Sequence, residues 1–269
     1  MQLLCALRFF ATVAFYNCIG ETLGVTKASV GRAIDNVSDA ICRLGQDWIV
    51  FPVGQTLATV QRAFHDIAGF PNVAGCIDGV FVRIQAPKED EQDFVNRKGF
   101  LSLNCQMTCD ASYKITSCVC KWPGSCHDSR MLRDSNINNK FETGQYNGIL
   151  LGDSAYPTRR FLMTPYNNPT TPQQQRFNNA LCKTRVRIEQ TYGILKRRFA
   201  CLHSGLRVDP NKAARIITAC AVLHNIGIYQ NDIINIDDDH IINVGDHPIS
   251  FNGVNDGNAT RDHICTSFF

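Results

Sequence analysis

The chain has 269 residues, of which 44% are hydrophobic and 19% are charged. These proportions are those of a folded globular protein, and they exclude disordered, collagen-like and coiled-coil chains. Lys and Arg number 27 against 24 Asp and Glu, so the net charge of +3 is too small to indicate a nucleic acid or a membrane as partner, and any electrostatic argument must be local.

The first 70 residues predict a helical region with the outline of a helix-turn-helix. Residues 3–19 are dense in apolar side chains, residues 20–24 contain a glycine break, and Thr26 can cap a second helix. The second helix of such a motif can enter the major groove of DNA. Lys27, Ser29 and Arg32 lie off its apolar stripe and are candidate DNA contacts. Two helices that only pack against the rest of the protein fit the pattern equally well.

From residue 71 onward the pattern becomes that of an α/β domain. Residues 73–85 are rich in β-formers, 101–109 alternate apolar and polar as a half-buried strand, 115–120 follow a turn, and 148–153 suit an interior strand. A short helix is expected at 129–136, and long helices at 173–200 and 211–229. This order predicts a mixed sheet, an antiparallel meander that a parallel strand extends after a crossover.

The sequence thus divides into three parts, with boundaries at residues 1–70, 71–229 and 230–269. The last part is acidic at its start and lacks helical periodicity, so it is expected to be poorly ordered. The first predicted helix begins at the first residues of the chain, as expected where upstream sequence is missing.

The cysteines and the apolar runs predict the cellular setting. Thirteen cysteines are an odd number without a C-x-x-C pair, which favours a reduced, intracellular protein. The longest apolar stretch is interrupted by Arg8, Asn17 and Glu21, so neither a signal peptide nor a membrane span is expected and the chain is read as soluble. A zinc site could be built from Cys118, Cys120, Cys126 and His127, although such a C-x-C pair more often marks packing thiols.

Four acidic residues occupy positions that strand and helix propensities disfavour. Asp78 interrupts a β-rich run, Asp153 ends an apolar strand, Glu189 lies on the long helix, and Asp128 follows a Pro-Gly turn. If the strands are neighbours, these side chains converge at one edge of the sheet. A bland alternative is that both strand aspartates serve turns and that Glu189 pairs with a basic residue on its own helix.

Convergent carboxylates would require a cation, because several negative charges cannot stay ionised side by side otherwise. Oxygen ligands favour Mg²⁺ or Mn²⁺, and two such ions suit in-line displacement at phosphorus. The sequence therefore predicts a divalent-metal site for phosphoryl chemistry.

Six blocks of sequence, in order, resemble the Harbinger transposase-derived nucleases of the PIF/Harbinger superfamily. The blocks are residues 76–79, 96–104, 122–130, 151–157, 187–199 and 221–225. The resemblance implies an RNase H-like fold with a DDE triad of Asp78, Asp153 and Glu189, and treats Asp128 as a further metal ligand. It also implies action on DNA with a Myb/SANT-like protein partner, in the nucleus and cytoplasm, and leaves an oligomer open.

One departure from the family pattern bears on activity. Members often have Thr-His after the Asp-Gly of the first block, and this chain has Val80 and Phe81. A polar neighbour that could position water or DNA is thereby lost. The main reading is a metal-dependent nuclease that performs phosphodiester hydrolysis or strand transfer. The alternative is a catalytically inactive DNA-binding or adaptor protein that retains the transposase fold.

Basic residues gather around Glu189 in the sequence. They are Lys183, Arg185, Arg187, Lys196, Arg197 and Arg198. Such a cluster would contact DNA phosphates without sequence preference, unless it is only a solvated helix face. Asn96, Arg97 and Lys98 form a second basic loop, which is expected to support substrate or structure.

Overall fold

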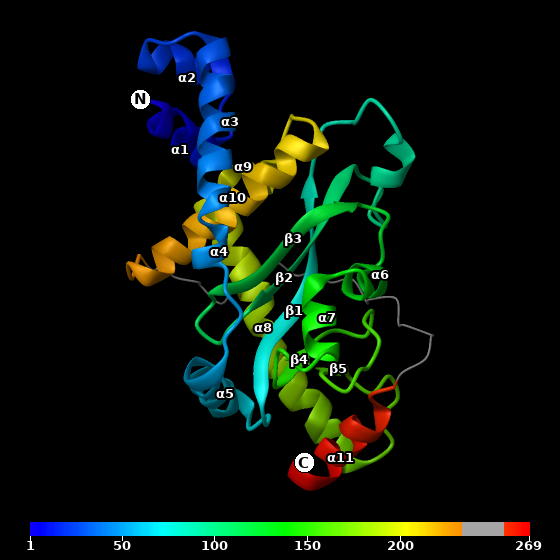
Figure 1. The fold of residues 1–269 in the computed structure, drawn as a ribbon. Helices are drawn as coiled ribbons and strands as arrows, with labels where there is room; N and C mark the ends of the chain where they lie inside the picture. The colour runs from blue at the N-terminus through cyan, green and yellow to red at the C-terminus, as the bar shows by residue number, and fades with distance from the viewer. Residues whose placement is uncertain (233–255) are drawn as a thin grey trace.

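A five-stranded mixed sheet lies at the centre of the computed structural model, which describes residues 1–232 and 256–269 (Figure 1). The strand order is β3-β2-β1-β4-β5, formed by β1 (Val73–Arg83), β2 (Ser102–Cys109), β3 (Ile115–Pro123), β4 (Ile149–Leu151) and β5 (Leu162–Met163). The first three strands form an antiparallel meander, and β4 runs parallel to β1. The predicted mixed sheet is confirmed, with β5 as an unpredicted addition in the segment between β4 and the long helix that follows it.

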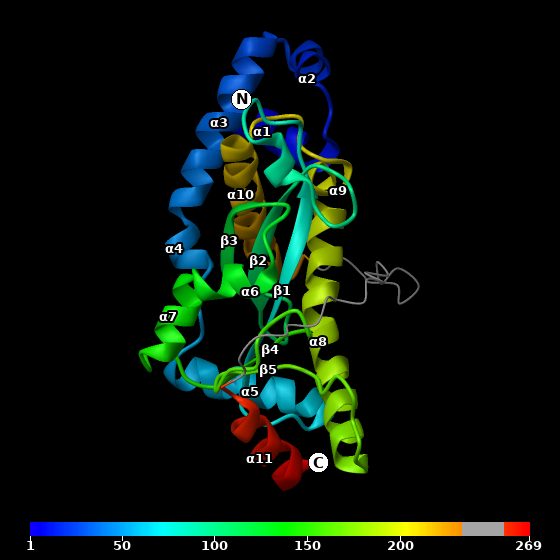
Figure 2. The same ribbon diagram turned by 90° about the vertical axis from the view of Figure 1, so that its right-hand side faces the viewer.

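Helices cover both faces of this sheet. They are α1 (Gln2–Thr12), α2 (Tyr16–Leu23), α3 (Lys27–Arg43), α4 (Gly45–Trp48), α5 (Gly54–Ala68), α6 (Asp128–Arg133), α7 (Asn136–Glu142), α8 (Pro172–Arg198), α9 (Ala200–Ser204), α10 (Pro210–Tyr229) and α11 (Asn258–Phe268), with a short 3₁₀ turn at Glu91–Phe94. Figure 2 shows α8 running beside β1, with α6 and α7 on the other side. Successive residues of β1 accordingly join different apolar clusters: Cys76 packs on the α8 side and Ile77 on the α7 side.

The alternation of β2 has a different meaning from the one predicted. Every residue of this strand is buried, whereas its polar face was expected to meet water. The polar side chains are hydrogen-bonded inside the protein: Asn104 donates to the Cys126 carbonyl, Gln106 to the Tyr156 hydroxyl, and Thr108 pairs with Thr116. The expectation of a half-buried strand was wrong, because α6 and the loops around it cover that face.

The N-terminal helices differ from prediction at one break. The apolar stretch at 3–19 is split into α1 and α2 at Val13, which has a positive φ of 54°. The expected cap of the next helix is present, since the Thr26 side chain accepts a hydrogen bond from the Ser29 amide. These helices share one continuous apolar core with the sheet, in which Ile34 of α3 and Ile216 of α10 both take part. The region at 1–70 therefore has no core of its own.

The last described residues also depart from expectation. Residues 258–268 form α11, which packs against α8, and the Arg176 side chain donates a hydrogen bond to the Phe269 carbonyl at 2.6 Å. The prediction of disorder was wrong for this part, because Phe269 packs its ring against Phe70 and Phe177. Residues 233–255 of the predicted tail lie outside the described residues. Among the helices that the structure describes, none has the length and apolar character to cross a bilayer.

Candidate active site

The sheet topology places Asp78 and Asp153 at the same height along two neighbouring parallel strands. Cys76 of β1 pairs with Leu151 of β4 in parallel register, and Asp78 and Asp153 each stand two residues further along. Asp78 is held by a hydrogen bond of 2.8 Å from the Gly79 amide to its Oδ1, and Asp153 by one of 3.0 Å from the Ala155 amide. Neither carboxylate can move freely, because its own backbone neighbour fixes it.

Helix α8 supplies the third carboxylate and a cation beside it. Arg185 and Glu189 are one turn apart on this helix, and the Arg185 Nη2 donates a short hydrogen bond to Glu189 Oε1. The other nitrogen, Nη1, donates to Asp78 Oδ2 at 3.4 Å. All three side chains are at most one-fifth exposed. One guanidinium therefore bridges two members of the predicted triad. The alternative expected from the sequence, in which Glu189 pairs with a basic residue of its own helix, is present as well.

Asp128 approaches across Gly79. It is the first residue of α6, and a Cβ added to Gly79 would lie 2.4 Å from its Oδ1 and 3.2 Å from the Asn104 Oδ1. Only glycine leaves room for this approach. The Asn104 Oδ1 atom is itself buried and has no hydrogen-bond partner among the described residues. An amide oxygen facing a carboxylate in this way is an arrangement that a bound cation would satisfy.

Burial and mutual repulsion raise the pKa values of the three aspartates. Desolvation and then the charge of Asp153 raise the pKa of Asp78 well above its ordinary value, although Arg185 opposes this. The same two causes raise the pKa of Asp128 to about 7. Desolvation also raises the pKa of Asp153, against the lowering effect of Arg185. The cluster thus favours any added positive charge, whether a proton or a metal ion.

The donor types fit Mg²⁺ or Mn²⁺, since the cluster offers carboxylate oxygens and one orphaned amide oxygen. In the residues that the structure describes, no three side chains of Asp, Glu, His or Cys converge closely enough to hold an ion as they stand. Between Asp78 and Glu189 lies the Arg185 guanidinium. The ligands predicted from sequence are neighbours, but a protein cation occupies part of the space between them.

A cavity of about 210 Å³ opens beside this cluster. Its lining combines carboxylates, cations and aromatic rings: Asp78, Gly79, Val80, Phe81, Arg97, Lys98, Phe100, Glu189, Tyr192 and Lys196. Phe81 lies edge-on to Phe100, with ring centroids 6.5 Å apart. The Arg97 guanidinium lies over the face of the Phe81 ring. The departure from the Thr-His pattern therefore places an aromatic wall at the cavity. Residue-by-residue reasoning missed Phe100 and Asn104, although the family block at 96–104 contained both.

The basic residues of α8 do not share one free face. Arg187 stacks on the Tyr113 ring and hydrogen-bonds its hydroxyl, and Arg198 is paired with Asp232. Lys196 donates a hydrogen bond to the Phe81 carbonyl at 3.3 Å, at the rim of the cavity. Lys183 and Arg197 are exposed. Of the α8 cations predicted to contact DNA, Lys196 is therefore the one that lines the cavity, whereas Arg185 is paired with the carboxylates beside it.

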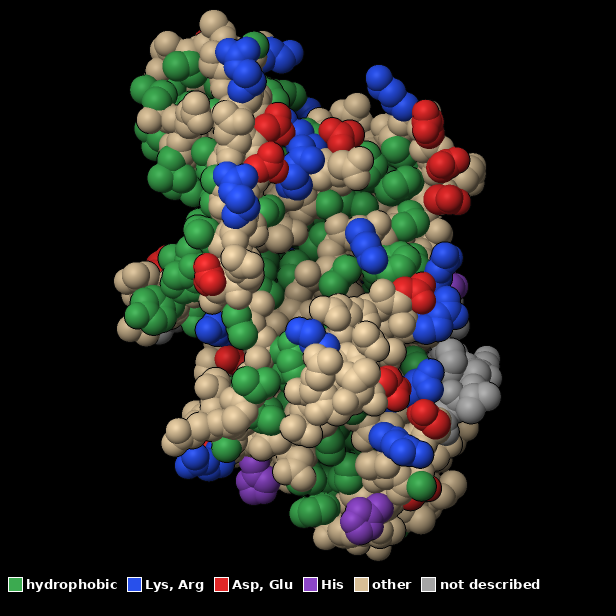
Figure 3. All heavy atoms as spheres, in the orientation of Figure 1, with side chains coloured by type: hydrophobic (Ala, Val, Ile, Leu, Met, Phe, Trp, Pro, Cys, Tyr) green, Lys and Arg blue, Asp and Glu red, His purple; other side chains and the backbone are tan. Residues whose placement is uncertain are grey.

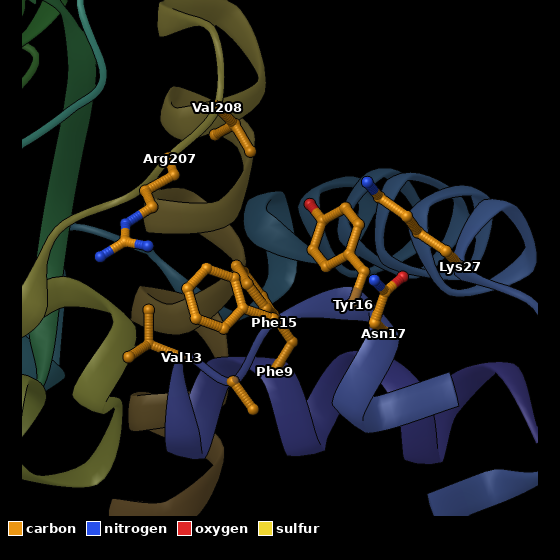
Figure 4. A pocket seen from close by; sticks show the side chains of 9 residues that line it. Phe9, Val13, Phe15, Tyr16, Asn17, Lys27, Arg207 and Val208 are labelled. Carbon is orange, nitrogen blue, oxygen red and sulfur yellow. The ribbon is translucent and has the colours of Figure 1, made fainter. Parts of the chain in front are cut away.

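The N-terminal candidates lie elsewhere on the surface. Lys27 and Arg32 are exposed on α3, and Arg32 donates a hydrogen bond to Ser29. Lys27 also lines a second cavity of about 280 Å³ between the α1–α2 connection and the loop before α10 (Figure 4). There Phe15 is 64% exposed, with the Arg207 guanidinium 4.9 Å from its ring centroid. The two groups of predicted DNA contacts are thus on separate elements.

Comparison with known proteins was made by family model, by sequence and by structure. A model described as "DDE superfamily endonuclease" matches residues 77–225. "Putative nuclease HARBI1" of Homo sapiens is 38% identical over 84% of this chain and 66% of that protein, and its Xenopus laevis counterpart is 35% identical over 86% and 68%. "Protein ALP1-like" of Arabidopsis thaliana is 26% identical over 84% and 60%. No solved structure matches significantly. This chain spans about two thirds of the length of its animal relatives.

Proposed function

Because this chain belongs to the DDE endonuclease superfamily, in the family of Harbinger transposase-derived nucleases, we propose that it cleaves phosphodiester bonds of DNA with divalent metal ions. The single observation that carries the proposal is that three carboxylates from three distant elements are gathered around Arg185. Asp78 and Asp153 stand at one level of adjacent parallel strands, and Glu189 reaches them from α8 through Arg185. Packing alone gives no reason to gather buried acids in this way.

In the proposed reaction the protein holds the metal ions and positions the phosphate group, and negative charge on the reacting oxygens is offset. Asp78, Asp153 and Glu189 would hold the metal, with Asp128 and the Asn104 oxygen on the far side of Gly79. When bound, Mg²⁺ or Mn²⁺ would offset charge on the attacking and leaving oxygens of the displacement. Lys196, at the rim of the cavity, would place the phosphate group. The backbone amides that fix Asp78 and Asp153 would keep both carboxylates in register.

The remaining features of the proposal concern the whole protein. We expect Lys27, Ser29 and Arg32 of α3 to add DNA contacts away from the cavity, since α3 begins at an exposed turn with two exposed cations. A Myb/SANT-like partner, an oligomer, and residence in nucleus and cytoplasm belong to the same proposal. They follow from the family and not from any contact within this chain.

Cleavage assays with site variants test the proposal. Purified protein is incubated with supercoiled plasmid and with an inverted-repeat duplex in Mg²⁺, Mn²⁺ or EDTA. We expect metal-dependent cleavage that falls at least about 100-fold in Asp153→Asn and in Glu189→Gln, because each removes a metal ligand. The matched control is Asp134→Asn, which changes an exposed aspartate paired with Arg133 and should leave cleavage unchanged.

Equal inactivity of all these proteins, with DNA binding retained, would overturn the nuclease and favour the second candidate. That candidate is a DNA-binding or adaptor protein, and one observation supports it. Hydrophobic side chains gather on the surface over the N-terminal helices in Figure 3. Met1, just before α1, is 70% exposed, and Leu3 of α1 is 55% exposed. Exposed apolar side chains of this kind, together with the exposed Phe15 at the cavity, suit a protein partner.

A further inference from the structure

Arg185 is the one α8 cation whose described contacts are with the carboxylates of the candidate site. It donates to Asp78 Oδ2 at 3.4 Å and to Glu189 Oε1, and it also lowers the pKa of Asp153. Two cations further along the helix have other partners. Arg187 is held by Tyr113, and Lys196 donates to a backbone carbonyl.

The oxygens that Arg185 uses are the ones a metal would need. Asp78 has two carboxylate oxygens: Oδ1 accepts the Gly79 amide and Oδ2 accepts Arg185. A carboxylate oxygen binds a metal ion through a lone pair. The same oxygen then accepts a weaker hydrogen bond from a guanidinium in the same position. An ion seated between Asp78 and Glu189 would also bring two positive charges against the guanidinium, which is only 20% exposed.

The contacts of Arg185 also offset the negative charge of the buried acids. Breaking a buried ion pair by removing one partner leaves uncompensated charge at high cost. Arg185 supplies this compensation to two carboxylates at once through separate nitrogens. It is therefore more than a surface partner of Glu189 on its own helix.

We infer that Arg185 is the internal cation of the carboxylate cluster, and that a divalent ion must displace it from Asp78 and Glu189 in order to bind. The inference deepens the proposed function and rests on it. Arg185 is a positioning residue: it keeps the carboxylates gathered before the metal arrives, and it weakens metal affinity because the ion has to break two charge-assisted hydrogen bonds. While paired with Asp78 and Glu189 it is withheld from DNA, which the sequence had predicted it to contact.

Metal affinity without DNA is the direct test. Mn²⁺ binding to the intact chain is measured by loss of the free-ion electron paramagnetic resonance signal and by calorimetry. We expect Arg185→Gln to bind Mn²⁺ about tenfold more tightly than the wild type, and to gain more in its unfolding midpoint when Mn²⁺ is added. The matched control is Arg176→Gln, which removes the same charge from α8 at a residue bonded to the Phe269 carbonyl, and it should bind as the wild type does.

Two further variants locate the effect. Asp153→Asn added to Arg185→Gln should abolish the gain, because the ion then lacks a ligand, and a gain that survives would place the ion elsewhere and overturn the inference. Arg185→Lys, which keeps one charge without the guanidinium fork, should show intermediate affinity and serves if the glutamine variant does not fold.

The outcomes separate the inference from the proposed function. If wild type and Arg185→Gln both fold and bind Mn²⁺ with equal affinity at the carboxylates, the inference fails while the metal site stands. Weaker binding by Arg185→Gln also overturns it, since Arg185 would then support the bound ion. If no variant binds Mn²⁺ at millimolar concentration, the metal-dependent nuclease fails and the inference fails with it.

Discussion

Helices α8 and α3 both carry basic residues that the sequence marked for DNA, and the structure treats the two sets differently. On α8, Arg185, Arg187 and Arg198 are engaged by carboxylates or by an aromatic ring of the protein. On α3, Lys27 and Arg32 are exposed, and the bond of Arg32 to Ser29 stays within the helix. The same residue types therefore hold the fold together in one helix and remain open to solvent in the other.

The difference follows from what each helix packs against. Helix α8 lies along β1 and β2, so its cations reach buried acids and the turn at Tyr113. Helix α3 presents its apolar stripe to α10 and the other N-terminal helices, which leaves its polar side in water. A cation beside buried acids stabilises through desolvated contacts, whereas an exposed one contributes little until a partner arrives.

The largest effect on stability outside the carboxylate cluster is expected at His224 of α10. This residue contacts Tyr113, which Arg187 of α8 also contacts. His224 of α10 hydrogen-bonds the Tyr113 carbonyl through Nε2 at 2.8 Å. Burial lowers the pKa of His224 from 6.5 to about 4. Its contribution to stability is thus full above pH 6.5 and is lost as the pH falls toward 4, by about 3 kcal/mol.

Denaturant unfolding at several pH values between 7 and 4 measures this contribution. In His224→Gln the stability difference from wild type should shrink as the pH falls, because the variant has no proton to take up at this position. His203→Gln, which changes an exposed histidine, should follow the wild-type curve. A constant difference across the range would show that His224 does not titrate in this window.

A smaller effect is expected from Arg187→Ala. Arg187 lies 4.9 Å from the centroid of the Tyr113 ring and bonds its hydroxyl, so the variant loses a cation–π contact and a hydrogen bond. We expect the free energy of unfolding to fall by about 2 kcal/mol, as measured in urea. If stability were unchanged while DNA affinity fell, Arg187 would belong with the α3 residues and the contrast between the helices would break.

The smallest effect on stability is expected from Lys27→Ala and Arg32→Ala on α3. Both side chains are exposed, so each variant should change unfolding free energy by less than about 0.5 kcal/mol. Under the proposed DNA contact, each should reduce the slope of log affinity against log salt by about 1. Arg43→Ala, which changes an exposed cation in the last turn of the same helix, is the control, and an equal change there would indicate only long-range charge.

Much of the architecture could be predicted because its signals are periodic and local. The strands at 73, 102 and 115 and the helices α8 and α10 were confirmed to within a few residues, apart from the longer end of β3. Helix α11 was missed because its stability depends on Phe269 packing against Phe70 and Phe177, which are distant in sequence. The family resemblance is confirmed, while the roles of the individual site residues stay predictions.

By itself the sequence determined the identities and order of the motifs, and through them the family and the candidate carboxylates. It also indicated that Asp78 and Asp153 could meet, since Asp78 lies within one predicted strand and Asp153 ends another that could be its neighbour. Only the tertiary structure decided that the polar face of β2 is buried, that Gly79 admits Asp128, and that Arg185 joins Asp78 to Glu189. The physical reason is that periodicity reports which residues share a face, whereas burial, partners and pKa depend on what another part of the chain lays against it.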